Sequence, residues 1–194
     1  MGKLQINRTP FEGLYVIDTL AFIDHRGAFA RWFCEYELAE VIGNRHIKNV
    51  NFSRTVKKGS VRGMHFQRPP KSEMKLIRCI NGRILDVVVD IRSDSPTYLE
   101  HFSVELSADN MKMIVVPEGF AHGFQSLEDN SEIMYLVTEF YSPECEGGLR
   151  YNDPELKINW PLDVADISDK DASHKLIDGT FKGLDTSSYG GCGL

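Results

Sequence analysis

The chain has 194 residues, of which 42% are hydrophobic and 26% charged, and its 22 Lys+Arg against 28 Asp+Glu give a net charge of −6. This composition excludes a generally disordered chain, and the acidic balance excludes a global basic field that would draw the protein to nucleic acid or anionic lipid. A chain of this length buries about 70% of its unfolded surface, which predicts one domain around one core.

Short β-type runs separated by turn residues dominate the chain. The Asn81-Gly82 dipeptide lies between two of these runs and favours a type I′ turn, so we expect the flanking strands to pair as an antiparallel hairpin. Helix is scarce, with candidates at 35–42 and 165–175. This pattern predicts an all-β fold, a jelly-roll barrel with a few short helices toward its C-terminal end. The predicted strands are residues 14–17, 28–33, 47–54, 74–80, 83–91, 98–106, 112–116, 122–127 and 133–140.

The composition changes near the C-terminus, where Gly and Ser replace apolar residues. We therefore expect a single domain at 1–178 and a flexible tail at 179–194. The N-terminus has no secretory h-region, and no apolar run approaches the ~20 residues of a membrane span, so a cytoplasmic protein is expected. The cysteines have no metal-binding spacing and are expected as free thiols: Cys34, Cys79, Cys145 and Cys192.

The run 83–91 contains acidic residues among apolar ones. Alternation places Asp86 on the same face as Ile84 and Val88, while the other face is wholly apolar. A strand that is apolar on both faces is buried on both sides, and carboxylates are seldom buried without a partner. Asp86 therefore indicates a polar lumen. The alternative, a strand-end carboxylate bonded to a nearby backbone amide, fits Asp90 better.

Three segments concentrate ionisable side chains. They are Arg62-Gly63-Met64-His65-Phe66-Gln67 with Lys75 after it, Pro117–Phe124 with His122, and Ser168-Asp169-Lys170-Asp171. Strand parity groups Arg62 with Met64, and His65 with Gly63. A lone His among apolar neighbours is more often a core residue than a catalyst. Two of them in a short-stranded barrel, with Lys75 and Tyr135 available, favour a catalytic role.

Proton abstraction beside a carbonyl needs a base that works near neutral pH, and His is such a base. It also needs a carboxylate to fix the imidazole tautomer, a cation or hydrogen-bond donor where the enolate oxygen forms, and an acid such as Tyr that returns a proton to the opposite face. The chain contains candidates for all of these roles. Sequence spacing alone does not bring them together.

Several motifs in register resemble the dTDP-4-dehydrorhamnose 3,5-epimerase family, and their order and spacing match from about Gly13 to Asp171. The resemblance implies a metal-free cupin barrel without a cofactor, a homodimer that exchanges N-terminal strands, and epimerisation of nucleotide-linked 4-keto-6-deoxyhexoses for surface polysaccharide, including O-antigen, or deoxysugar biosynthesis. The motifs are residues 62–67, 75–78, 86–90, 95–97, 106–110, 117–124, 152–154 and 168–171.

The resemblance also implies roles for individual residues. His65 would be the base and Asp171 its orienting partner. Lys75 would steady the enolate with His122 beside it, and Tyr135 would be the proton donor. Nucleotide and sugar contacts are implied for Arg62 and Lys170 at the diphosphate, Glu146 near the sugar or nucleotide, Tyr141 stacked on the base, and Arg26, Phe29, Asn49 and Asn51 in segments that reach toward the nucleotide.

Arg31 departs from the family pattern, which usually has an acidic residue five places after the equivalent of Arg26. Thymine N3 carries a hydrogen and needs an acceptor, whereas cytosine N3 is an acceptor and favours a donor such as Arg. Asn49, where Gln is more usual in the family, points the same way. This leads to the hypothesis that the carrier is CDP rather than dTDP. The alternative is that Arg31 turns to solvent or pairs with an acid such as Glu35.

Two other functions stay open at this point. The segment around His122 fits a motif whose His is often a metal ligand, so a metal-dependent cupin using His65, His122 and Glu73 is one alternative. The place where such proteins carry His-x-His reads His65-Phe66-Gln67, and Gln is a poor ligand for a transition metal. A non-catalytic sugar-nucleotide-binding barrel is the other alternative. Whether C3, C5 or both would be inverted also stays open.

Overall fold

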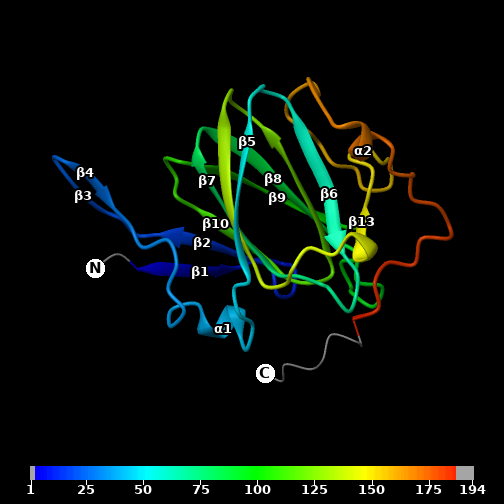
Figure 1. Cartoon of the computed structure of the whole chain (residues 1–194), viewed down its shortest axis with the longest axis horizontal. Coiled ribbons are helices and arrows are strands. Elements are labelled where there is room, and N and C mark those ends of the chain that lie inside the picture. The colour runs from blue at the N-terminus through cyan, green and yellow to red at the C-terminus, as the bar shows by residue number, and fades with distance from the viewer. Residues whose placement is uncertain (1–2, 187–194) are drawn as a thin grey trace.

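The computed structural model describes residues 3–186, which fold into two antiparallel sheets that face each other as a barrel (Figure 1). This confirms the predicted all-β jelly-roll fold. One sheet has the order β1(Leu4–Arg8)-β2(Tyr15–Thr19)-β10(Met113–Val116)-β7(Lys75–Asn81)-β12(Ser131–Val137)-β5(Asn49–Thr55). The other has the order β13(Glu146–Gly148)-β6(Val61–Gln67)-β11(Phe120–Ser126)-β8(Arg83–Asp90)-β9(His101–Ser107).

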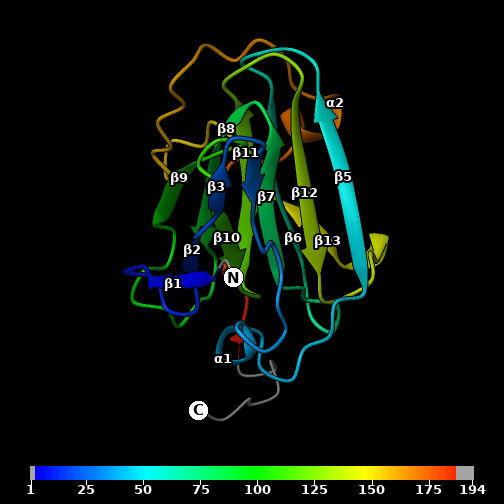
Figure 2. The same cartoon turned by 90° about the vertical axis from the view of Figure 1, so that its left-hand side faces the viewer.

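The core between the sheets takes inward residues from both, including Ile77 and Ile133 from one sheet and Val88 and Phe124 from the other. The outer face of the first sheet is covered by the segment that carries the short helix α1 (Ala39–Ile42), near the end where β5 begins (Figure 2). The C-terminal chain covers the outer face of the second sheet. The remaining helical turns are η1 (Pro143–Cys145) and α2 (Asp169–Ala172).

The predicted hairpin at Asn81-Gly82 is wrong. β7 pairs with β10 and β12, whereas β8 pairs with β11 and β9, so the turn leads from one sheet to the other. Gly82 has a φ of +70°, but Asn81 does not adopt the positive φ that a type I′ turn needs at both positions. Each strand already has a partner on both sides, which leaves no edge for the two to pair.

The strand pattern also missed β1, β3 (Phe22–Asp24), β6 and β13, and only the start of the predicted strand at 28–33 is formed, as β4 (Gly27–Phe29). These strands are short, exposed or interrupted by Gly, so local alternation does not reveal them.

The predicted burial of β8 on both faces is confirmed. Asp86 is completely buried and faces inward with Ile84 and Val88, while Val87 packs in the outer core. Asp90 instead binds locally, as expected of a strand-end carboxylate: its Oδ1 accepts the backbone N–H of Arg92 at 3.0 Å. Asp86 thus remains the acidic group of the lumen.

Part of the expected flexible tail is packed. Leu184 is 7% exposed, and its N–H donates to the carbonyl of Ile91 at 2.6 Å. Phe181 packs against the same outer core. The packed chain therefore extends past 178, while residues 187–194, and with them Cys192, lie outside the described residues. The other cysteines are free thiols, as predicted: Cys34, Cys79 and Cys145.

The hairpin of β3 and β4 extends away from the barrel (Figure 1) and carries exposed apolar side chains. Phe22 is 55% exposed, Ile23 79% and Phe29 64%. A projecting apolar hairpin of this kind is suited to contact with another protein surface. Within the described residues, no helix is long and apolar enough to cross a membrane.

Replacement of Ile77 by Ala should destabilise the fold by about 2–5 kcal/mol, because this side chain is fully buried between the sheets and its loss leaves a cavity. Urea unfolding measures the change as a lower midpoint with an unchanged slope. Leu176→Ala is the control: this side chain is 49% exposed, and its truncation should change stability by no more than about 0.5 kcal/mol. Equal effects of the two substitutions would contradict the assigned core.

Candidate active site

A β-bulge in β6 creates the site. His65 lies opposite His122 on β11, and Arg62 lies opposite Phe124. Three residue steps along β6 therefore pair with two along β11. The extra residue cancels the alternation between Arg62 and His65, and both side chains line one cavity between the sheets. The parity grouping expected from a regular strand is therefore wrong at this point.

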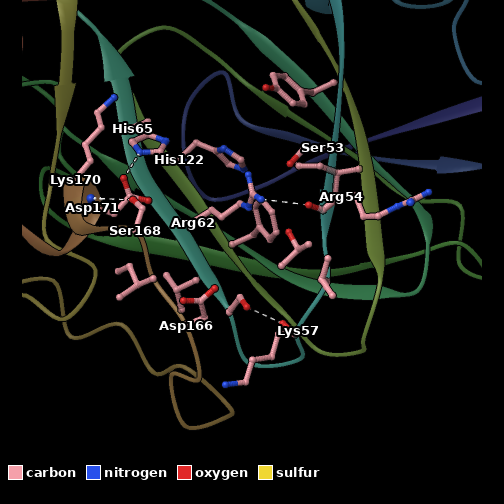
Figure 3. A pocket seen from close by; sticks show the side chains of 18 of the residues that line it. Ser53, Arg54, Lys57, Arg62, His65, His122, Asp166, Ser168, Lys170 and Asp171 are labelled. Carbon is pink, nitrogen blue, oxygen red and sulfur yellow. Dashed lines mark hydrogen bonds and ion pairs between the residues drawn. The ribbon is translucent and has the colours of Figure 1, made fainter.

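Asp171 approaches the bulge from the C-terminal segment, as Figure 3 shows. Its Oδ1 lies 2.7 Å from His65 Nε2, and its Oδ2 accepts the backbone N–H of Gly63 at 3.0 Å. The Ser168 hydroxyl caps α2 by accepting the N–H of Asp171 at 3.1 Å. Burial raises the pKa of Asp171, but the hydrogen bonds from His65 and Gly63 outweigh it and leave that pKa below its usual value. An ionised Asp171 places the imidazole hydrogen on Nε2, which leaves Nδ1 as a free acceptor.

A second His–Asp pair lies next to the first. His122 Nε2 is 2.8 Å from Asp86 Oδ2, and Asp86 is fully buried. Burial raises the pKa of Asp86, and the nearby His122 and Lys75 offset this only in part. Oδ1 of Asp86 has no hydrogen-bond partner among the described residues. The Asp86 carboxyl is therefore more readily protonated than an exposed carboxyl.

Lys75 and Tyr135 come from the opposite sheet, on β7 and β12. Lys75 Nζ lies 3.1 Å from a carboxylate oxygen of Glu73, and both side chains are largely buried. Burial raises the pKa of Tyr135, and the Glu73 carboxylate raises it further. The phenol therefore keeps its proton at neutral pH.

These groups line two adjoining cavities. The larger has a volume of about 590 Å³, and the smaller, of about 300 Å³, shares His65, Lys75 and Tyr135 with it. Arg62, His122, Lys170 and Asp171 line the larger cavity, and Asn49, Asn51, Tyr141 and Glu146 line the smaller. The structure thus brings together most of the residues that the resemblance implied.

An ion-pair network borders the smaller cavity. Glu146 accepts from Lys170 Nζ at 2.6 Å and from the Tyr141 hydroxyl at 2.9 Å. Burial raises the pKa of Glu146, but these two bonds outweigh it and hold that pKa below its usual value. Tyr141 is 62% exposed, which leaves its ring available for stacking.

The predicted residues of the N-terminal segment lie elsewhere. Arg26 pairs with Asp24 at 2.7 Å on the projecting hairpin that also carries Phe29, and neither residue lines the two cavities. Arg31 pairs with Glu37. This matches the alternative in which Arg31 pairs with an acid, although the partner is Glu37 and not Glu35. The hypothesis of CDP specificity loses its supporting residue in this arrangement.

The sequence placed Glu73 at the site only as a candidate metal ligand, and it gave His174 no role. Glu73 stands two residues before Lys75 on the same side of the chain, a signal that strand alternation could have given. His174 approaches the first His–Asp pair, with ring centroids 6.3 Å apart for His174 and His65.

The residues proposed for a metal-dependent cupin have other partners, since His122 binds Asp86 and Glu73 binds Lys75. Among the described residues, the group close enough to share an ion is a different one, namely His65, Asp171 and His174, with donor atoms within 4.8 Å of one another. Two of these donors already bind each other directly.

Comparison with known proteins identifies the family. The family model described as dTDP-4-dehydrorhamnose 3,5-epimerase matches residues 8–178. The dTDP-4-dehydrorhamnose 3,5-epimerase of Salmonella typhimurium is 38% identical over 88% of this chain and 94% of its own. The Bacillus anthracis enzyme, solved with TDP and PPi bound, superposes with a TM-score of 0.86 at 37% identity, over 90% of this chain and 99% of its own.

The Legionella pneumophila 3,5-epimerase, solved in complex with dTDP-4-keto-L-rhamnose, gives a TM-score of 0.85 at 36% identity, over 93% of this chain and 98% of its own. Sequence, fold and site therefore agree, and the chain belongs to the dTDP-4-dehydrorhamnose 3,5-epimerase family of isomerases.

Proposed function

We propose that the protein inverts C3 and C5 of a dTDP-linked 4-keto-6-deoxyhexose by proton abstraction and reprotonation through an enolate. The observation that carries the proposal is the His65–Asp171 pair, which faces a cavity shared with Lys75, His122 and Tyr135. The complex of the Legionella relative with a dTDP-linked 4-keto sugar supports the choice of substrate.

The base in this proposal is Nδ1 of His65. Asp171 accepts the hydrogen of Nε2, so the lone pair of Nδ1 is available to take the hydrogen beside the sugar's C4 carbonyl. The C–H electron pair becomes the enolate double bond, and the carbonyl oxygen takes the negative charge. Asp171 then stabilises the imidazolium that forms, as in the His–Asp portion of serine hydrolase triads.

The enolate oxygen needs positive charge or hydrogen-bond donors, and Lys75 supplies an ammonium group. His122 can donate as well, but only from Nδ1, because its Nε2 faces Asp86. Donation from Nδ1 requires one proton there and a second between Nε2 and the carboxyl. The raised pKa of the buried Asp86 favours retention of that second proton.

Inversion needs an acid on the other side of the sugar ring. Tyr135 lies on β12 and His65 on β6, in opposite sheets, so the two groups stand on opposite walls of the cavity. A ring held between them can lose a proton to His65 and gain one from Tyr135. Every step is assigned to side chains of the chain itself, without a metal or an organic cofactor.

The diphosphate would lie at Arg62 and Lys170, which line the larger cavity, and the base would lie on Tyr141, which lines the smaller one. A guanidinium suits phosphate oxygens geometrically. Arg26 and Phe29 are carried on the projecting hairpin, so they would act in the site of a second copy within a homodimer that exchanges N-terminal strands. The exposed apolar side chains of this hairpin support such a dimer.

A place in O-antigen or other deoxysugar biosynthesis fits this substrate. The cytoplasmic location expected from the sequence remains a prediction.

His65→Asn should lower kcat for epimerisation at least 10²-fold, because the variant lacks a base. Asp171→Asn should also lower kcat strongly with little change in KM, because the imidazole tautomer is no longer fixed. His46→Asn, which changes an exposed His, is the control and should keep normal turnover. Near-normal turnover in His65→Asn would refute the assigned base.

Tyr135→Phe should separate proton abstraction from inversion. The base still forms the enolate, so deuterium from D₂O should enter the substrate at its original face, while stereochemical inversion falls much further. NMR of recovered substrate and product measures both. Tyr98→Phe changes a hydroxyl that donates to the carbonyl of Phe181 outside both cavities, so it should leave exchange and inversion unchanged. Equal loss of exchange and inversion in Tyr135→Phe would mean that the phenol serves enolate formation or binding instead.

Binding competition among dTDP, CDP, UDP and GDP tests the nucleotide. Since Arg31 is held by Glu37, dTDP should bind most tightly, and Arg31→Glu should not reverse the order. Isothermal titration calorimetry gives the four dissociation constants. Tighter binding of CDP, lost in Arg31→Glu, would restore the CDP hypothesis.

A further inference from the structure

Glu73 is a carboxylate within the catalytic cavity to which the mechanism above gives no role. Its side chain is 12% exposed, and it lines the smaller cavity together with His65, Lys75 and Tyr135. It lies two residues before Lys75, the first residue of β7, so an extended chain directs both side chains to the same side.

The contact with Lys75 is an ion pair of 3.1 Å in which both partners are largely buried. Buried charges are costly unless they are paired, so the pair fixes a long, flexible Lys side chain in one position. An ammonium group held in place stabilises an enolate oxygen better than one that must be reoriented during the reaction.

Glu73 also acts on Tyr135. A carboxylate near a phenol opposes the formation of phenolate, and the pKa of Tyr135 is raised by burial first and by Glu73 second. Arg62 opposes this effect. Charged or titratable groups reach the two cavities around the phenol from both sheets and from the connecting segments, and the buried Asp86 of β8 lies behind His122. They are Lys75 of β7, Arg62 and His65 of β6, His122 of β11, Arg54 of β5, Glu146 of β13, Lys170 and Asp171 of α2, and Lys57, Glu73, Tyr141 and Asp166 of the connecting segments.

We propose that Glu73 is a positioning residue of the epimerase site, which holds the Lys75 ammonium group at the enolate oxygen and keeps the Tyr135 phenol protonated until it donates. The role of Glu73 at the enolate rests on the proposed function. Its effect on Tyr135 can be measured without any substrate.

The test is Glu73→Gln, which keeps the shape of the side chain and removes its charge. Tyrosinate absorbance is titrated in the variant and the wild type, each against the matching Tyr135→Phe protein, so that the difference isolates Tyr135 from the other tyrosines. The midpoint should fall in Glu73→Gln, because the carboxylate that opposes formation of the phenolate is gone. The alkaline limb of kcat for inversion should move down with it, and deuterium exchange into the substrate should slow at least tenfold, because Lys75 is no longer held.

Two variants serve as controls. Glu73→Asp keeps the charge and should leave the Tyr135 midpoint close to that of the wild type. Glu139→Gln removes a carboxylate that pairs with Lys71 outside both cavities and should change neither the midpoint nor the rates. Should Glu73→Gln not fold, Lys75→Gln and the double variant Lys75→Gln/Glu73→Gln give the same comparison for Tyr135.

An unmoved Tyr135 midpoint together with unchanged exchange would overturn the proposal. A uniform loss of activity without a shift of the midpoint or of the alkaline limb would assign Glu73 a structural role only, and would overturn it as well. Failure of the wild-type protein to epimerise would count against the proposed function, whereas the spectroscopic titration would still decide whether Glu73 controls Tyr135.

Discussion

The bulge in β6 is the constraint on which the site depends, because it brings the β6 and β11 backbones into close contact at two glycines. A Cβ on Gly63 would lie 2.6 Å from the Cα of Gly123, and a Cβ on Gly123 would lie 2.7 Å from the carbonyl oxygen of Arg62. Gly63 also has a φ of +118°, which other residues rarely adopt. The bulge turns Arg62 and His65 into the same cavity and directs the Gly63 N–H at Asp171. The register of β6 with β11 and the positions of His65 and Asp171 thus depend on this one bulge.

The charged side chains buried in the lumen are paired with groups of opposite charge or with imidazoles. Three largely buried carboxylates in or beside the cavities each contact a nitrogen base or cation within about 3.1 Å: Asp171 with His65, Asp86 with His122, and Glu73 with Lys75. Unpaired, such groups would be costly to bury. Paired, they are fixed in position before substrate arrives, which is the condition for stabilising an enolate without reorganisation. The same pairs therefore lower the cost of burying these charges and hold the groups in place for proton transfer.

The sequence predicted correctly those features that depend on the residues of a single strand. The alternation in β8 was enough to place Asp86 inside the lumen, and the local hydrogen bonds of Asp90 followed from its place at the strand end. It failed where the outcome depended on distant partners. Asn81-Gly82 has a hairpin sequence, but β10, β12, β11 and β9 occupy the edges that the hairpin would have used.

The candidate site shows the same division between local and distant signals. The resemblance named His65, Lys75, Tyr135 and Asp171, and the fold brings them together across more than a hundred residues. Residue types alone did not reveal the bulge, which is visible only in the pairing of β6 with β11. Glu73 was considered only as a metal ligand, and its pairing with Lys75 was missed, because a carboxylate near a Lys is common on protein surfaces and only burial distinguishes this one. For Arg31 the sequence left two arrangements open, because its partner Glu37 could not be chosen over other nearby acids from sequence.

The central claim is that the lumen inverts a sugar carbon by removing and returning a proton. Epimerisation of a dTDP-linked 4-keto-6-deoxyhexose by the wild-type protein in D₂O, followed by NMR at C3 and C5, tests it most directly. Each inverted carbon of the product should carry solvent deuterium. Inverted product that retains its original hydrogen at those carbons would contradict it.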